Sequence, residues 1–430
     1  MTDAHSHDPH DVVVPESTKR ILIFVMAPLL LAIVAGLVVL WPGTLKNDSL
    51  TEAVAADDFF RASVVSLTRG PCSGTDPSAG ITCSIASVTL SQGPDDGETI
   101  ELTEEADVGG ADLEVGDEIV LAYYPDAGPG FEYSYADRER RAPMLVLGAI
   151  FAIAVVALGR WKGARALAGV GVSLAVLATF ILPALLDGSD PVLVALVGAG
   201  AIAVVALYLS HGINVGSTIA LIGAFASLAI VGLLAWGFIE LTHLSGRSAE
   251  EAGFLQITAS QVKLQGLILA GIVIGTLGVL DDVTVLQVSA VWELHHANPD
   301  MARRDIYRAA IRIGRDHIAS TVNTLVLAYA GAALPLFLLL TQARQGLSDT
   351  ANSEVVAVEI VRTLVGSIGL VASVPITTLL AVWVIGQHTR DAGHNDPRRY
   401  ASRAERQLWK QAEAQPAAPT PPPPPPDRAL

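Results

Sequence analysis

Two adjacent acidic residues, Asp281 and Asp282, interrupt a long apolar run and are the first candidates for chemistry. An ionisable group inside a membrane-spanning helix costs a few kcal/mol, so it usually faces a bundle interior or a water path. Spacings of three, four and seven place Asp282 on one helix face with Gly271, Gly275, Gly278 and Ser289. Because small residues let another helix approach closely, we expect Asp282 to lie in a helix contact. Asp281 lies about 100° around the same helix and is the second candidate.

The depth of the acids decides between two interpretations of this pair. In the alternative interpretation, both acids lie near the water interface and only end the apolar run. If the helix continues to an interfacial Trp292, Asp282 lies about 15 Å inside that end. This depth favours a buried Asp282, although the sequence leaves open which of the two acids is buried.

Polar residues in the next two apolar runs are candidate partners for the acid. Asn323 and Thr324 lie at a depth similar to that of Asp282, and Ser373 and Thr377 lie in the corresponding half of the last run. The sequence therefore predicts a polar pocket formed by the last three membrane helices, with these residues and Ser289 as transport-pathway candidates. Hydrogen bonding between helices without transport is the alternative, but it explains an acid less easily.

Arginines form a regular stripe in the connection before the Asn323 run, at Arg304, Arg308, Arg312 and Arg315. Ile306, Ala310 and Ile313 lie on another face of the same expected helix. This pattern is typical of an amphipathic helix lying on an anionic membrane surface. A solvated, charged linker helix is the alternative.

The composition indicates that these residues belong to a membrane protein. The chain is 51% hydrophobic and 16% charged, and its mean hydropathy is +0.48, unlike an ordinary globular protein. A net charge of -16 argues against a nucleic-acid partner. A spanning helix needs about 20 mostly apolar residues, and eight runs qualify: 21–41, 143–159, 166–186, 191–209, 215–239, 264–291, 318–340 and 359–385. The predicted fold class is an all-α polytopic membrane bundle of about eight transmembrane helices.

The basic residues predict how these helices are oriented. Lysine and arginine gather in segments 160–165, 303–315 and 390–403, on the same side of the membrane as Lys19 and Arg20 in an eight-span arrangement. Cytoplasmic loops carry the excess of such residues. We therefore expect both termini in the cytoplasm and residues 42–141 on the extracytoplasmic side of the cytoplasmic membrane.

The segment after the first apolar run changes character. Residues 42–141 alternate apolar and polar positions between turn signals, which predicts a small β-barrel or sandwich domain. Cys72 and Cys83 both lie in this segment, on the predicted outer side, so we expect a disulfide. Two free thiols are the alternative.

The predicted domain organisation has five parts. They are a disordered tail at 1–19, an anchor helix at 20–41, the β-rich domain at 42–141, a seven-helix membrane domain at 142–389 and a proline-rich disordered tail at 390–430. The histidines and aspartates of the first tail are interpreted as a solvated tail and not as a metal site. No zinc motif, phosphate-binding glycine loop or nucleophile elbow stands in a suitable context. We expect no metal, no cofactor and no enzymatic activity.

Three segments resemble a known family of bacterial membrane proteins. They are 275–283, then 314–317 leading into 321–329, and finally 366–370 with 375–377. These segments look like the YibE/F family, which has no assigned biochemical function, and the resemblance implies a bacterial cell membrane protein. The family pattern has one acid near Asp282, so the adjacent Asp281 is a departure from it. A fainter, fold-level similarity connects residues 275–331 with the transmembrane helices of RND-type transporters and SecD/SecF.

Two functional hypotheses follow from these residues. The first is a permease-like protein that moves a small solute or ion through the bilayer, with Asp282 as the carboxylate that would couple movement to protons. The second is a non-transporting membrane scaffold or assembly factor whose outer β-domain binds a partner. The substrate, the coupling ion and the oligomeric state are left open by the sequence.

Overall fold

The computed structural model describes residues 15–43, 56, 58–71, 82–105, 113–128, 130–248, 250–342 and 346–394. Cys72, the first 14 residues and residues 395–430 lie outside this part, and with them the disulfide and most of both predicted tails. The chain divides into two compact units. One contains Met1–Gly36, Ala195–Leu244 and Ile268–Leu430, and the other contains Leu37–Val194 and Ser245–Leu267.

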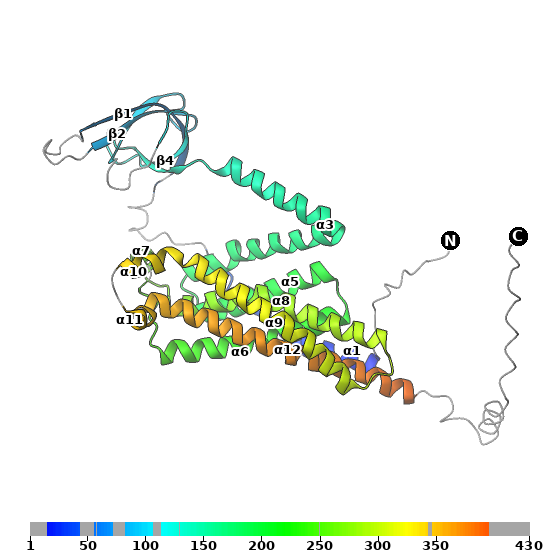
Figure 1. Ribbon diagram of the computed structural model, residues 1–430. Coiled ribbons are helices and arrows are strands. Elements are labelled where there is room, and N and C mark those ends of the chain that lie inside the picture. Colours follow the sequence, from blue (N-terminus) through cyan, green and yellow to red (C-terminus); the bar gives the residue numbers. More distant parts are fainter. Residues whose placement is uncertain are drawn as a thin grey trace, which may run out of the picture. The chain divides into compact units, whose positions relative to one another are not determined.

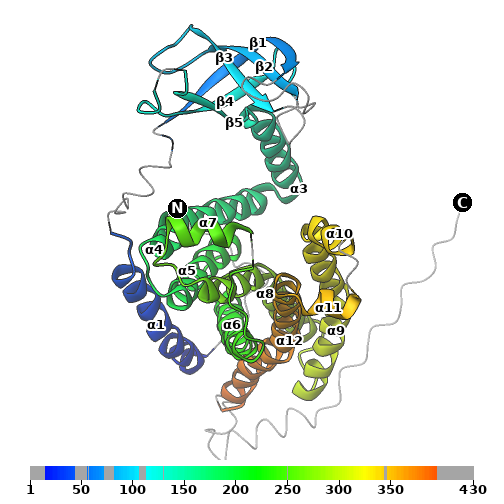
Figure 2. The same ribbon diagram turned by 90° about the vertical axis from the view of Figure 1, so that its left-hand side faces the viewer.

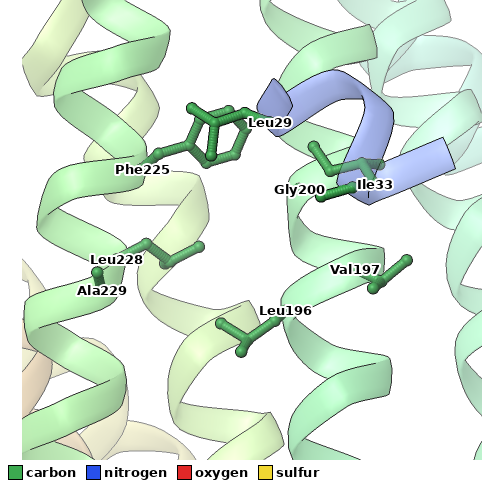
Figure 3. Close-up of a pocket in the computed structure, with 9 residues that line it drawn as sticks. Leu29, Ile33, Leu196, Val197, Gly200, Phe225, Leu228 and Ala229 are labelled. Carbon is green, nitrogen blue, oxygen red and sulfur yellow. The ribbon is translucent and has the colours of Figure 1, made fainter. Parts of the chain in front are cut away.

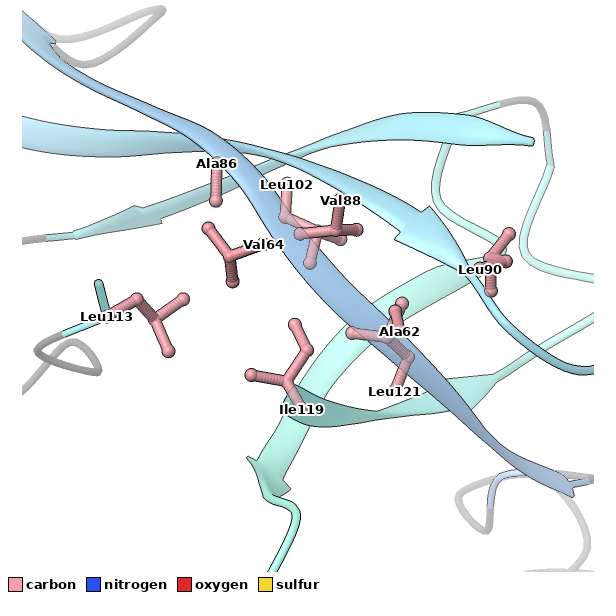
Figure 4. Close-up of a cluster of buried hydrophobic side chains, with 9 residues drawn as sticks. All are labelled: Ala62, Val64, Ala86, Val88, Leu90, Leu102, Leu113, Ile119 and Leu121. Atoms are coloured by element: carbon pink, nitrogen blue, oxygen red, sulfur yellow. The ribbon is translucent and has the colours of Figure 1, made fainter. Parts of the chain in front are cut away.

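The β-rich segment forms a five-stranded antiparallel sheet in the order β3-β2-β1-β4-β5. The strands are β1 (Asp58–Pro71), β2 (Thr82–Leu90), β3 (Thr99–Glu105), β4 (Glu118–Tyr123) and β5 (Tyr133–Arg138). Alternate residues point to one face, where Val64, Val88, Leu102, Ile119 and Leu121 form a core (Figure 4). The prediction of a small β-rich domain is confirmed as an antiparallel sheet. Cys83 lies in β2, opposite Gly70 of β1.

A sharp reversal divides the first long apolar helix of the membrane part. α3 (Arg141–Val176) continues through the π-helical turn η2 (Leu177–Ile181) into α4 (Leu182–Leu186). Within α3, Arg160 has φ 50° and ψ -130°, which are not helical angles. Figure 1 shows α3 as two legs that double back on each other. The reversal coincides with the predicted connection between the runs 143–159 and 166–186.

The other unit is a bundle of helices. It contains parts of α1 (Glu16–Val39), α5 (Pro191–His211) and α8 (Leu264–Ala297), together with α6 (Val215–Leu241), α9 (Arg303–Ala332), α10 (Leu334–Gln342), α11 (Leu347–Asn352) and α12 (Glu354–His394). A short helix of the unit that contains the β-sheet, α7 (Glu250–Thr258), precedes α8. α12 packs against both α6 and α9, and Val283 of α8 joins Leu370 and Val374 of α12 in a common apolar cluster. Figure 2 shows α6, α8, α9 and α12 gathered together.

Six helices of the described chain are long and apolar enough to cross a membrane. They are Glu16–Val39, Arg141–Leu186, Pro191–His211, Val215–Leu241, Leu264–Ala297 and Glu354–Gly386. The sequence predicts eight, and the difference has two sources. The stretch Arg141–Leu186 contains the reversal at Arg160. The predicted run 318–340 is divided between α9, whose first half is rich in arginine, and α10, which begins at Leu334.

Candidate functional site

The buried face of α8 decides which of the two acids lies inside the protein. Apolar residues at 272, 273, 280, 283 and 291 are buried, and they define the side that faces the other helices. Asp281 is half-buried on the flank of this side, whereas Asp282 is exposed. Of the two acids, Asp281 is therefore the one closer to the core of the bundle. Asp281 and Asp282 are about 100° apart around the helix axis. The Asp281 carboxyl group therefore lies on the flank of the core, and the Asp282 carboxyl group lies on the outer surface.

The glycine stripe of α8 lies beside α12 at Gly271 and beside α9 at Gly275, and it is open at Gly278. Gly275 and Gly278 are exposed and Gly271 is half-buried. A methyl group added at Gly278 would meet nothing within 4 Å. A methyl group added at Gly275 would lie 3.2 Å from the Tyr329 hydroxyl oxygen, so another helix side chain comes close at Gly275 but not at Gly278.

Glycines elsewhere allow the helices to approach. A Cβ added to Gly314 of α9 would lie 2.6 Å from Gln287 Nε2 and 2.6 Å from Val374 Cγ1. A Cβ added to Gly366 of α12 would lie 3.1 Å from Thr276 Oγ1 of α8. Gly223 of α6 lies directly against the hydroxyl group of Thr377. Each of these glycines is therefore next to a buried polar side chain.

A hydrogen bond between two fully buried side chains connects α8 and α12. Thr378 Oγ1 lies 2.9 Å from Gln287 Oε1 and 2.6 Å from the Val374 carbonyl oxygen of its own helix, and its single proton is shared between these two acceptors. Gln287 Nε2 is buried and has no hydrogen-bond partner among the described residues. Thr378 belongs to the same polar group of the last apolar run as Ser373 and Thr377, whereas Gln287 was not predicted from the sequence. The signal was an amide in an apolar run, six residues after Asp281 and therefore about 9 Å further along the helix.

Ser373 and Thr377, which the sequence did predict, lie in the same polar region. Both are completely buried. Ser373 Oγ donates to the Leu370 carbonyl oxygen at 2.7 Å, which satisfies it within α12. Thr377 Oγ1 has no partner among the residues that the structure describes. An Asp281 oxygen, Oδ1, is likewise buried without a partner in that part of the chain.

The remaining predicted pathway residues lie on the outside of the bundle. Ser289, Asn323 and Thr324 are exposed. Thr324 Oγ1 donates to the Ser320 carbonyl oxygen of its own helix at 3.1 Å. No hydrogen bond connects Asn323 with Asp282 in the described part of the structure, so the predicted meeting of these residues is not observed. The inner face of α9 is formed by other residues, including Ile318, Val322 and Leu325.

The predicted basic stripe is exposed along one side of α9. Arg304, Arg308, Arg312 and Arg315 all point outward. On the apolar side of α9, Ile306 and Ala310 are buried inside the protein, whereas Ile313 is exposed. The segment continues without a break into the rest of α9, and Arg303 donates to the Gly386 carbonyl oxygen of α12. The basic segment is therefore part of one continuous helix that packs against α12.

A pair of charged residues, Glu359 and Arg362, lies near the beginning of α12. Arg362 Nη1 donates to Glu359 Oε1 at 2.7 Å within α12, and both side chains are partly buried. Tyr329 of α9 lies within electrostatic range of both. These residues were not predicted from the sequence, although a charged pair just inside the last apolar run is a visible signal.

An apolar cavity lies between α1, α5 and α6. It has a volume of about 230 Å³ and is lined by residues of α1, α5 and α6, among them Leu29, Ile33, Leu196 and Phe225 (Figure 3). Its lining offers almost no hydrogen-bonding groups to a polar solute. The cavity is therefore separate from the polar residues of α8 and α12.

In the β-domain, electrostatic contacts stabilise turns. The backbone N–H of Glu114 donates to Asp117 Oδ2 at 2.9 Å, and Arg138 lies 3.2 Å from the same oxygen. These contacts hold the pKa of the Asp117 carboxyl below its usual range. Burial, together with a hydrogen bond to Asp95, raises the pKa of the Tyr133 hydroxyl.

The long apolar helices and the polar groups buried between them define a membrane protein with several membrane helices. The chain belongs to the YibE/F family, because the family described as YibE/F-like protein matches residues 147–387, more than half of the chain. This match confirms the resemblance noted from the sequence. No curated protein and no solved structure matches the chain.

Proposed function

We propose that the chain is a permease-like transporter of a small solute or ion, with Asp281 as the carboxylate that couples transport to protons. The observation that carries this proposal is the buried, unpartnered Oδ1 of Asp281 in the described structure. A carboxylate held in an apolar helix is costly unless a proton, an ion or a solute compensates it. A carboxylate that binds and releases a proton or an ion during transport must be compensated in this way.

The polar residues beyond Asp281 support a route for such a charge. Gln287 Nε2 and Thr377 Oγ1 are buried with unused hydrogen-bonding capacity in the described structure. Gln287 lies about 9 Å from Asp281 along α8, and its bond to Thr378 brings α12 into the same region. A proton or a hydrated ion that leaves Asp281 therefore has polar partners on two helices.

The proposed topology has eight membrane spans, with both termini in the cytoplasm of a bacterial cell and residues 42–141 outside. The reversal at Arg160 supports two spans within Arg141–Leu186. The apolar half of α9 together with α10 supplies another. The exposed arginines at the beginning of α9 then lie on the cytoplasmic side, as expected from their charge.

The decisive experiment measures solute uptake and efflux by purified protein in vesicles, with and without a proton gradient. The readouts are internal pH and a panel of small solutes and ions. Asp281→Asn keeps the size of the side chain and removes its charge, so it should abolish proton-coupled movement while the protein stays inserted. Asp282→Asn is the matched control, because its side chain is exposed, and it should retain most activity. The proposal fails if Asp281→Asn is fully active, or if wild-type vesicles move neither protons nor any solute of the panel.

A scaffold function is the second candidate, and exposed aromatic side chains in the β-domain favour it. Phe59 and Phe131 are 54% and 75% exposed, and aromatic residues are enriched in the contact surfaces of protein interfaces. Cross-linking in native membranes with a photoreactive residue at position 131 should capture a specific partner if this function holds. Loss of that product in Phe59→Ser, without loss of folding, would favour the scaffold over the transporter.

A further inference from the structure

The orientation of the Arg362 guanidinium leaves one of its edges unused. Nη1 donates to Glu359 Oε1 at 2.7 Å. Nε is buried and has no acceptor among the described residues. In a guanidinium group, Nε and Nη2 share the edge that lies away from Nη1. This edge presents two parallel N–H donors, which is the geometry that binds a carboxylate or phosphate group through two hydrogen bonds.

The part of α8 that lies next to this edge of Arg362 consists of glycine positions, which carry no side chain. A Cβ added to Gly271 would lie 3.8 Å from Arg362 Nη2, and one added to Gly275 would lie 3.2 Å from the Tyr329 hydroxyl oxygen. Gly275 and Gly278 are exposed, so the glycine side of α8 is open beside these two polar groups. Three helices thus contribute a guanidinium group, a phenolic hydroxyl group and a stretch of backbone free of side chains.

We propose that Arg362 and Tyr329 form a binding site for an oxyanion, namely the carboxylate or phosphate group of a free solute or of a lipid headgroup. Glu359 offsets the charge of Arg362 but occupies only one of its five N–H donors. An arginine inside a membrane helix is costly, and unused donors add to that cost. A bound oxyanion satisfies the Nε–Nη2 edge and accepts a further hydrogen bond from the Tyr329 hydroxyl group.

The site is distinct from the acid on which the proposed function depends. Gly271 precedes Asp281 by ten residues on α8, which separates them by about 15 Å. Arg362 lies eight residues from the beginning of α12, or about 12 Å. This inference does not depend on transport, because binding at Arg362 is measured at equilibrium.

The test is equilibrium binding to the purified full-length chain in a phosphate-free detergent. The probes are inorganic phosphate, acetate and short-chain phosphatidic acid. Wild type should bind at least one probe, and Arg362→Gln should weaken that binding at least tenfold. Arg362→Lys should give an intermediate loss, since it keeps the charge but not the two-donor edge, and Tyr329→Phe should cost a few-fold. Competition by phosphate or acetate identifies a site for free solutes, whereas binding of phosphatidic acid alone identifies a lipid headgroup site.

Two controls separate this result from a folding defect or a general charge effect. Arg308→Gln removes an exposed arginine of the basic stripe and should leave binding unchanged. The double variant Glu359→Gln with Arg362→Gln leaves no unpaired charge and should remain folded, yet it should bind as weakly as Arg362→Gln. Unchanged binding in Arg362→Gln, equal losses in Arg308→Gln, or no binding of any probe by wild type would overturn the proposal.

Discussion

Thr378 of α12 and Gln287 of α8 are joined by a 2.9 Å hydrogen bond between side chains that have no exposed surface. This contact connects two helices that are far apart in the sequence. It also positions the Gln287 amide against Gly314 of α9. A single polar contact therefore organises the meeting point of three helices.

The first prediction concerns this hydrogen bond. Thr378→Val keeps the shape of the side chain but leaves Gln287 without its donor, so the protein should lose about 1–3 kcal/mol of stability. Detergent-induced unfolding of the purified protein measures the loss. Adding Gln287→Leu should restore most of it, because both polar partners are then replaced by apolar groups. Additive losses in the double variant would show that the bond does not couple the two helices.

The second prediction compares two glycines. Gly314→Ala places a methyl group 2.6 Å from Gln287 Nε2 and from Val374 Cγ1, so it should cost about 1–3 kcal/mol. Gly278→Ala meets nothing within 4 Å and should be neutral or stabilising by up to about 1 kcal/mol, since alanine favours helix. Thermal unfolding of the two variants under the same conditions shows which substitution is more destabilising. If Gly278→Ala were more destabilising than Gly314→Ala, the tight helix contact would lie on the glycine stripe of α8.

The apolar runs and the β-rich segment were predictable because length and alternation are local properties of the sequence. A bilayer requires long apolar helices, and a sheet with one buried face requires alternation such as that of Ile119 and Leu121 in β4. The reversal near Arg160 was also predictable, because a short basic segment separates two apolar runs. These features depend on neighbouring residues and on the solvent around them.

The side that each helix presents to the others was not predictable in the same way. In α8, residues that would face lipid are as hydrophobic as residues that face protein. Hydrophobicity therefore does not indicate which side of α8 packs against the other helices. The spacing of Gly275, Gly278 and Asp282 therefore fits a buried stripe and an exposed stripe equally well. The contact between Gln287 and Thr378 spans 91 residues, and no local period indicates such a pairing.

The third prediction concerns pH and the turn before β4. Hydrogen bonding from the Glu114 N–H, with Arg138 nearby, lowers the pKa of Asp117. A lowered folded-state pKa means that the carboxylate stabilises the fold above its unfolded-state pKa, and that this contribution is lost as the pH falls through the folded-state value. Amide hydrogen exchange should show that the turn loses protection in this acidic range.

Asp117→Asn should remove this pH dependence and reduce protection at neutral pH. Asp126→Asn, an exposed residue in another turn, is the control and should behave as wild type. If Asp117→Asn kept the wild-type pH dependence, another group would be responsible for it.

The last prediction separates an eight-span topology from a six-span one by the sides of two loops. With eight spans, Ser189 lies outside the cell and Ala302 lies in the cytoplasm. If only the six long apolar helices cross, and Arg141–Leu186 crosses once, both assignments reverse. Single cysteines at these positions, in a Cys72→Ser and Cys83→Ser background checked for insertion, are labelled with a membrane-impermeant thiol reagent. We expect labelling at position 189 in intact cells and at position 302 only after permeabilisation, because the arginines that follow Ala302 favour the cytoplasmic side. The opposite pattern at both positions would establish six crossings and would require a different route for any solute that reaches Asp281.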